Sequence, residues 1–160
     1  MSQKFKRRLV REKVLQYLYA YEMNKDNPEE MRKNLLSEIK DESDKEFAEN
    51  LINRSIINKT QLDNRIVDKV TNWEMNRIAL IDKILLRIGL TELLYFPDIP
   101  PKVSINEVIE IAKMYSTAGS GKFINGILDA ILIEEKSAGR LNKTGRGLLD
   151  ESISMHSDQE

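Results

Sequence analysis

Cysteine is absent from this chain of 160 residues, which excludes disulfides, thiolate metal sites and a cysteine nucleophile. No apolar run approaches the roughly 20 residues that a membrane span needs, and the first residues lack the apolar stretch of a signal peptide. The only histidine, His156, lies close to the C-terminus, in a segment too polar to hold a catalytic triad or a metal shell in place. We therefore expect a cytoplasmic protein that has no membrane segment and binds no metal.

Signals of catalysis are also scarce. The run Gly119-Ser120-Gly121-Lys122 looks like the end of a phosphate-binding loop, but Ser116 stands where the earlier glycine is required. Phe123 then takes the place of the hydroxyl that would bind magnesium. Carboxylates are plentiful, yet their spacing places them on surface faces of helices, and no pair is marked for acid and base roles. We expect no catalytic residue, no cofactor and hence a binding protein rather than an enzyme.

Basic residues are concentrated at the N-terminus. The first 14 residues carry six basic side chains and one acidic one, a charge of +5, so the remainder carries −6 of the total of −1. Cations in the first turn of a helix oppose its dipole, by about 0.3–1 kcal/mol each at low salt. A solvated helix end is the ordinary explanation of such a run, but this position favours a phosphate-binding face made by Lys4, Lys6, Arg7, Arg8 and Arg11. We expect replacement of the arginines by alanine to leave the helices intact.

Apolar residues recur at helical spacing through most of the chain, and neither strand alternation nor an internal repeat is evident. These patterns predict an all-α fold of about seven helices in a single compact domain. Helices are expected over 5–23, from Pro28, over 43–70 with a break near 58–60, over 78–96, from Ser104, and after Gly121.

Two capping boxes are predicted to begin helices, Ser43 with Glu46 and Ser104 with Glu107. Gly126 lies inside the last helical pattern and suggests a close approach of two helices. From Gly139 onward the apolar pattern ends. We therefore expect a domain over 1–139 and a disordered tail over 140–160 that the fold does not need, in which Lys143 and Arg146 add slightly to the affinity for an anionic partner.

The order and spacing of several short motifs closely resemble the NusB transcription antitermination factors over roughly residues 5–135. These motifs are Arg11-Glu12, Leu18-Tyr19, Trp73, Asp82–Ile88, Glu92-Leu93, Ile99-Pro100, Val103–Glu107, Ile111–Lys113 and Lys122–Asp129. The resemblance implies two three-helix bundles that share a long helix. It also implies binding of single-stranded boxA-type RNA of ribosomal RNA leaders together with the ribosomal protein NusE, in a complex that joins RNA polymerase and other Nus factors to suppress premature termination.

The resemblance also implies roles for particular residues. The family's arginine-rich first helix matches Arg7, Arg8 and Arg11, and the family's RNA contacts extend to Lys122, Phe123 and Asn125. Tyr19 and Asp82 match positions that face NusE. Many members have an acidic residue where this chain has Gly119, so a contact that needs that carboxylate is in question.

Each of these residues has a plainer structural explanation. Phe123 shares the apolar stripe of the last helix, which is typical of a core residue, and Asn125 is suited to satisfying backbone groups near a helix start. Asp82 is equally suited to a surface ion pair, whereas Tyr19 lies off the main stripe and is expected to be exposed. Two other functions remain open: an RNA-targeting domain like that of ribosomal RNA cytosine methyltransferases, and a protein-only adaptor.

Overall fold

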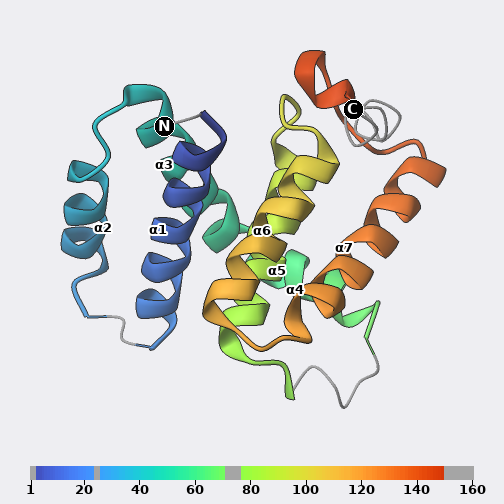
Figure 1. The fold of residues 1–160 in the computed structure, drawn as a ribbon, viewed down its shortest axis with the longest axis horizontal. Coiled ribbons are helices and arrows are strands. Elements are labelled where there is room, and N and C mark those ends of the chain that lie inside the picture. Colours follow the sequence, from blue (N-terminus) through green and yellow to red (C-terminus); the bar gives the residue numbers. More distant parts are fainter. Residues whose placement is uncertain (1–2, 24–25, 71–76, 150–160) are drawn as a thin grey trace.

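The computed structural model describes residues 3–23, 26–70 and 77–149, with side chains from residue 6 onward. Seven α-helices lie in these ranges, without any β-strand, as the sequence predicted (Figure 1). The helices are α1 (Gln3–Met23), α2 (Pro28–Ser37), α3 (Glu42–Ile57), α4 (Lys59–Val67), α5 (Leu80–Tyr95), α6 (Pro101–Tyr115) and α7 (Ser120–Ser137), followed by a short 3-10 helix, η2 (Gly145–Leu148). Trp73 and the side chain of Lys4 lie outside the described residues.

The helices form two three-helix groups. Helices α1, α2 and α3 pack on one another, and α5, α6 and α7 make the second group (Figure 1). Helix α5 also contacts α1, α3 and α4, and its side chains from Ile84 to Leu93 are buried. The predicted pair of bundles is therefore confirmed, with α5 as the helix that joins them. No helix of the described part has both the length and the apolar character needed to cross a bilayer.

The two predicted capping boxes are wrong. Asp41 caps α3 by accepting a hydrogen bond from the Asp44 amide at 3.1 Å, so Ser43 lies inside the first turn. Helix α6 begins at Pro101, whose fixed φ and missing amide proton suit a first helical position. Ser104 and Glu107 are consequently buried within α6, and their side chains face partners on other helices.

Glycine permits a close helix approach at Gly89, not at Gly126. A Cβ atom on Gly89 would lie 2.7 Å from Leu128 Cδ1, so α5 and α7 approach closely there. Gly126 is exposed, and a Cβ atom on it would meet nothing within 4 Å. The prediction for Gly126 is therefore wrong, because this face of α7 carries no neighbouring helix.

The packed part of the chain continues beyond the boundary expected at residue 139. Residues 141–149, named here the C-terminal segment, fold back over the end of α5. Lys143 and Gly147 are buried, and the Thr144 amide donates to the Pro97 carbonyl at 2.9 Å. The expected disordered tail therefore does not begin at residue 140. Residues 150–160 lie outside the described part.

Candidate nucleic-acid interface

Arg7 is held at the N-terminal end of α1 by groups from α3. Its Nε donates to Asp44 Oδ1 at 2.8 Å and its Nη2 donates to Ser43 Oγ at 3.0 Å. The guanidinium also lies 4.4 Å from the centre of the Phe47 ring, a cation–π distance. These contacts use two of the five N–H donors of the guanidinium, and the side chain remains 25% exposed. Arg7 is thus preorganised while it keeps donors for an anionic ligand.

Lys6 and Arg8 flank Arg7. Lys6 lies 3.8 Å from Asp41 and 3.9 Å from Asp44, and its side chain is 43% exposed. Such loose, solvated pairs contribute little to stability. Arg8 instead donates from Nε and Nη2 to the two carboxylate oxygens of Glu107 at 2.8 and 3.1 Å. This hydrogen bonding to Glu107 raises the pKa of Arg8 above its ordinary value. Lys6 is therefore the more solvated cation, whereas Arg8 is held in a bidentate pair with Glu107.

Arg11 does not lie on an exposed face. Its side chain is 3% exposed, and its Nε and Nη2 donate to the Glu92 carboxylate at 2.8 and 2.7 Å. Glu92 is fully buried in α5 and also accepts from Ser104 Oγ at 2.9 Å. Burial lowers the pKa of Arg11, but the neighbouring Glu92 and Glu107 charges outweigh it, so the pKa lies above its ordinary value.

Two expectations about Arg11 are corrected by this geometry. As a phosphate contact, Arg11 would have to leave a buried, charge-assisted, bidentate pair, which is among the stronger polar interactions in proteins. As a surface residue, it would be removable without harm, yet its loss would strand the buried charge of Glu92. Arg11 therefore joins α1 to α5 and has a structural role rather than a direct contact with phosphate.

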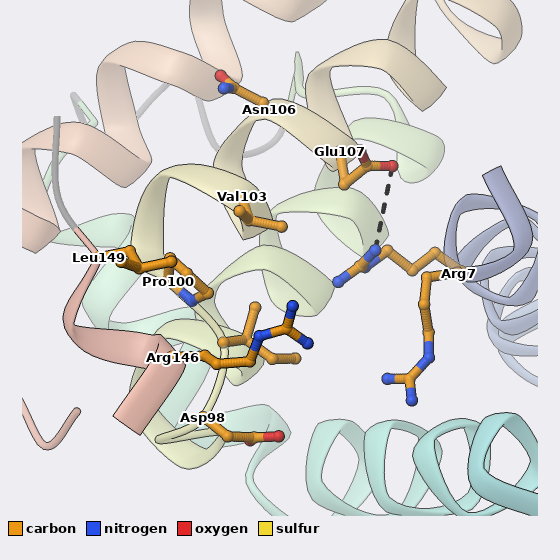
Figure 2. A pocket seen from close by; sticks show the side chains of 10 residues that line it. Arg7, Asp98, Pro100, Val103, Asn106, Glu107, Arg146 and Leu149 are labelled. Carbon is orange, nitrogen blue, oxygen red and sulfur yellow. Dashed lines mark ion pairs between the residues drawn. The ribbon is translucent and has the colours of Figure 1, made fainter. Parts of the chain in front are cut away.

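A cleft of about 450 Å³ opens beside these arginines. Arg7 and Arg11 line it from α1, while the start of α6 and the loop before it supply Asp98, Ile99, Pro100, Val103, Asn106 and Glu107. Arg146 and Leu149 of the C-terminal segment complete the lining (Figure 2). The cleft thus combines guanidinium groups with exposed apolar surface, including Val103 and Leu149. Phosphates and base faces of a nucleic acid require these two kinds of group.

The structure places the α7 candidates away from this cleft. Lys122 and Asn125 are exposed, and Phe123 is partly buried against the core. All three lie in the first turns of α7, which follows the C-terminal end of α6 (Figure 1). Arg8 instead contacts Glu107, and the eight residues of α6 from there to Tyr115 alone span roughly 12 Å. The predicted RNA-binding residues therefore form two groups at different ends of α6.

The two candidate partner residues differ in exposure. Tyr19 is 39% exposed on α1, as its position off the apolar stripe predicted. Asp82 is only 7% exposed and accepts from Ser120 Oγ at 2.8 Å, which links the first turns of α5 and α7. Its other carboxylate oxygen is buried without a hydrogen-bond partner. The surface ion pair considered for Asp82 is therefore wrong, since no described cation pairs with it.

Sequence reasoning missed two carboxylates that shape the site, Glu92 and Glu107, which neutralise arginines of α1. It named Arg146 as a minor contributor in a disordered tail, whereas the structure places Arg146 in the lining of the cleft. For Glu92 a signal existed, because a carboxylate inside the most apolar helix requires a buried cationic partner. For the packing that fixes Arg146 no such signal existed, since the C-terminal segment has no apolar period.

Comparisons with known proteins agree with this architecture. The model of the NusB family matches residues 8–132. A transcription antitermination protein NusB of Chloroherpeton thalassium is 51% identical over 146 residues, which cover 90% of this chain and 69% of that protein.

Solved structures give the same result. A structure of T. maritima NusB is similar with a TM-score of 0.74 and 40% identity, covering 80% of this chain and 91% of that one. A chain from the crystal structure of antitermination factors NusB and NusE in complex with dsRNA has a TM-score of 0.71 and 25% identity, covering 84% and 99%. The similarity therefore extends through both helical bundles.

Proposed function

The chain belongs to the NusB family of transcription antitermination proteins, and on this premise we propose that it binds boxA-type RNA of ribosomal RNA leaders together with the ribosomal protein NusE. The complex then joins RNA polymerase and other Nus factors in the cytoplasm and suppresses premature termination. The protein acts by binding, without catalysis. The Chloroherpeton thalassium relative and the T. maritima structure are both NusB proteins, and this chain matches most of the length of each. This extent of similarity favours the NusB function over an RNA-targeting domain of a methyltransferase.

The arginine-lined cleft at the N-terminal end of α1 is the observation that carries the proposal. Arg7 is fixed there by Asp44 and by the Phe47 ring, so little side-chain entropy is lost when it binds a phosphate. Lys6, the residue before Arg7 in α1, adds a solvated positive charge. Val103 and Leu149 offer apolar surface for a base. Arg8 and Arg11 support this site through Glu107 and Glu92.

The RNA path is proposed to continue toward α7. Lys122 and Asn125 are exposed at the start of that helix, and Lys122 forms no ion pair with a described carboxylate. A strand of several nucleotides would pass from the cleft along α6 to these residues. Phe123, half withdrawn into the core, is then a support for the helix end with a partly accessible ring edge.

NusE is proposed to dock near Tyr19, which offers an exposed aromatic side chain of the kind that interfaces favour. Asp82 would act indirectly, by ordering the starts of α5 and α7 through Ser120. NusE then adds a second RNA-contacting surface, and the pair binds RNA more tightly than this chain alone.

Anisotropy titrations of labelled RNA test the proposal. The purified chain is titrated into single-stranded boxA RNA, the same RNA as a duplex, and a scrambled strand, each with and without NusE and over a salt series. We expect preference for boxA, tighter binding with NusE, and a slope of log K against log salt that falls by about 0.7 per phosphate contact removed from a single strand. The duplex is included because RNA in the related complex is double-stranded.

Charge-matched variants locate the binding. Arg7→Gln keeps a side chain that can reach Asp44 but removes the charge, so it should weaken binding and reduce the salt slope. Lys136→Gln removes the same charge from an exposed position in the last turn of α7 that does not line the cleft, and should bind like the parent. Equal affinity for boxA and scrambled RNA, unaffected by NusE, would contradict the proposed function.

A further inference from the structure

The C-terminal segment is fastened to the end of α5 by a buried lysine. Lys143 is 9% exposed, and its Nζ donates to the carbonyl oxygens of Glu92 at 3.1 Å and Phe96 at 2.8 Å. A cation is favourable at the C-terminal end of a helix because of the helix dipole. Each of these carbonyls already accepts one backbone amide, from Phe96 and Ile99 respectively, and Lys143 adds a second donor to both. Lys143 therefore ties this segment to α5, the helix whose Glu92 carboxylate binds Arg11.

Backbone contacts fix the register of the segment. The Thr144 amide donates to Pro97 O at 2.9 Å, and Gly145 has a φ of +52°, a left-handed conformation that glycine adopts most readily. Gly147 lies so close to the same loop that a Cβ atom would be 1.9 Å from Pro97 O. Only glycine fits at that position. Arg146, which lies between these two glycines, is therefore held at a defined place beside the cleft.

This register brings Arg146 into the cleft wall, where Figure 2 shows it near Asp98 and Pro100. Arg7 and Arg11 are paired with Asp44 and Glu92. Arg146 is exposed and forms no ion pair with any carboxylate that the structure describes, Asp98 included. An anion that enters the cleft thus meets in Arg146 a guanidinium whose donors are not already committed.

We propose that the C-terminal segment forms one wall of the RNA-binding cleft, in which Arg146 binds a phosphate of the RNA and Lys143 positions Arg146. This inference rests on the proposed function and adds to it, since the segment lies beyond residues 8–132, which the family model matches. Leu149, on the same wall, extends the apolar surface next to that phosphate.

Arg146→Gln is the central variant. It keeps a polar side chain with an N–H donor but removes the charge, so we expect boxA RNA affinity to fall about five- to tenfold and the salt slope to drop by about 0.7. Arg146→Lys keeps the charge and should retain most of the slope. Arg140→Gln is the matched control, because Arg140 precedes the segment, pairs with Glu135 and does not line the cleft. Its affinity should equal that of the parent.

Lys143→Met tests the anchor. Methionine keeps the apolar stem but donates no hydrogen bond to Glu92 O or Phe96 O, so the segment loosens and RNA affinity should fall as in Arg146→Gln. Because both variants act through one contact, their effects should not add in the double variant. Additive losses would overturn the positioning role of Lys143.

The outcomes separate this inference from the proposed function. If the parent shows no preference for boxA RNA, the proposed function fails first. If the parent prefers boxA and Arg146→Gln matches it in affinity and salt slope, the inference about the segment is overturned while the function stands. Loss of affinity in Arg140→Gln equal to that in Arg146→Gln would also overturn it, since the effect would then be one of overall charge.

Discussion

Replacing Arg11 by alanine should destabilise the fold more than it affects RNA contacts. The substitution removes both donors that reach Glu92 and leaves that fully buried carboxylate with Ser104 as its remaining side-chain donor. Stranding one member of a buried ion pair costs about 3–5 kcal/mol. A natural domain has a total stability of about 5–15 kcal/mol, so the variant would lose a large share of it.

Urea unfolding followed by circular dichroism measures this loss. The midpoint should fall while the m-value stays that of the parent, and the melting temperature should fall by roughly 10 °C, given about 2–4 °C per kcal/mol for a chain of this size. The double variant Arg11→Met with Glu92→Leu is the control, because replacing both charges by apolar groups is often neutral within about 1–2 kcal/mol. A loss below about 1 kcal/mol for Arg11→Ala would refute the reasoning and return Arg11 to the exposed RNA contacts.

Four further outcomes follow from the same contacts. Truncation after Gly139 should lower the unfolding free energy by about 1–3 kcal/mol in urea titrations, because the charge-assisted hydrogen bonds from Lys143 to two carbonyls at the end of α5 are lost. Burial lowers the pKa of Lys143 to about 8 from its ordinary 10.5, so between these values the unfolded chain binds more protons and stability should rise from pH 8 to pH 10; urea titrations should show that Lys143→Met lacks this rise. Gly147→Ala should displace the C-terminal segment and weaken RNA binding in anisotropy titrations without unfolding α1–α7. Tyr19→Ala should weaken NusE binding by about 1–2 kcal/mol in calorimetry at an unchanged melting temperature. Asp82→Asn should leave NusE affinity within about 0.5 kcal/mol of the parent, because Asp82 is buried and an asparagine oxygen can still accept the hydrogen bond from Ser120 that orders the two helix starts.

Local sequence patterns were sufficient to predict the helices, but they did not predict which polar side chains pair between helices. The apolar stripes of α1, α5 and α7 depend on residues three and four apart, so the sequence contains that information. The pattern Ser-x-x-Glu at Ser104 and Glu107 fitted a helix cap equally well locally, but these side chains serve Glu92 and Arg8 across the helix interface. Such a choice depends on tertiary contacts.

In the candidate site, too, the sequence predicted the local pattern but not the tertiary contacts. A cluster of arginines in the first turns of a helix indicated an anionic partner, which the Lys6 and Arg7 surroundings support. The charge pattern did not distinguish Arg11, buried against Glu92, from the partly exposed basic residues before it in α1. It suggested only a slight contribution from Arg146 and not its place in the cleft, which depends on hydrogen bonds from Lys143 to two carbonyls far away in the sequence.

Photo-crosslinking tests the location of the RNA site most directly. Single-stranded boxA RNA with 4-thiouridine at successive positions is bound to the chain with NusE, irradiated, and the crosslinked peptides are mapped by mass spectrometry. The account predicts crosslinks to peptides that contain Arg7 and Arg146, with further ones near Lys122 from nucleotides at one end of the RNA. Crosslinks confined to the α7 start, with none at the cleft, would contradict it.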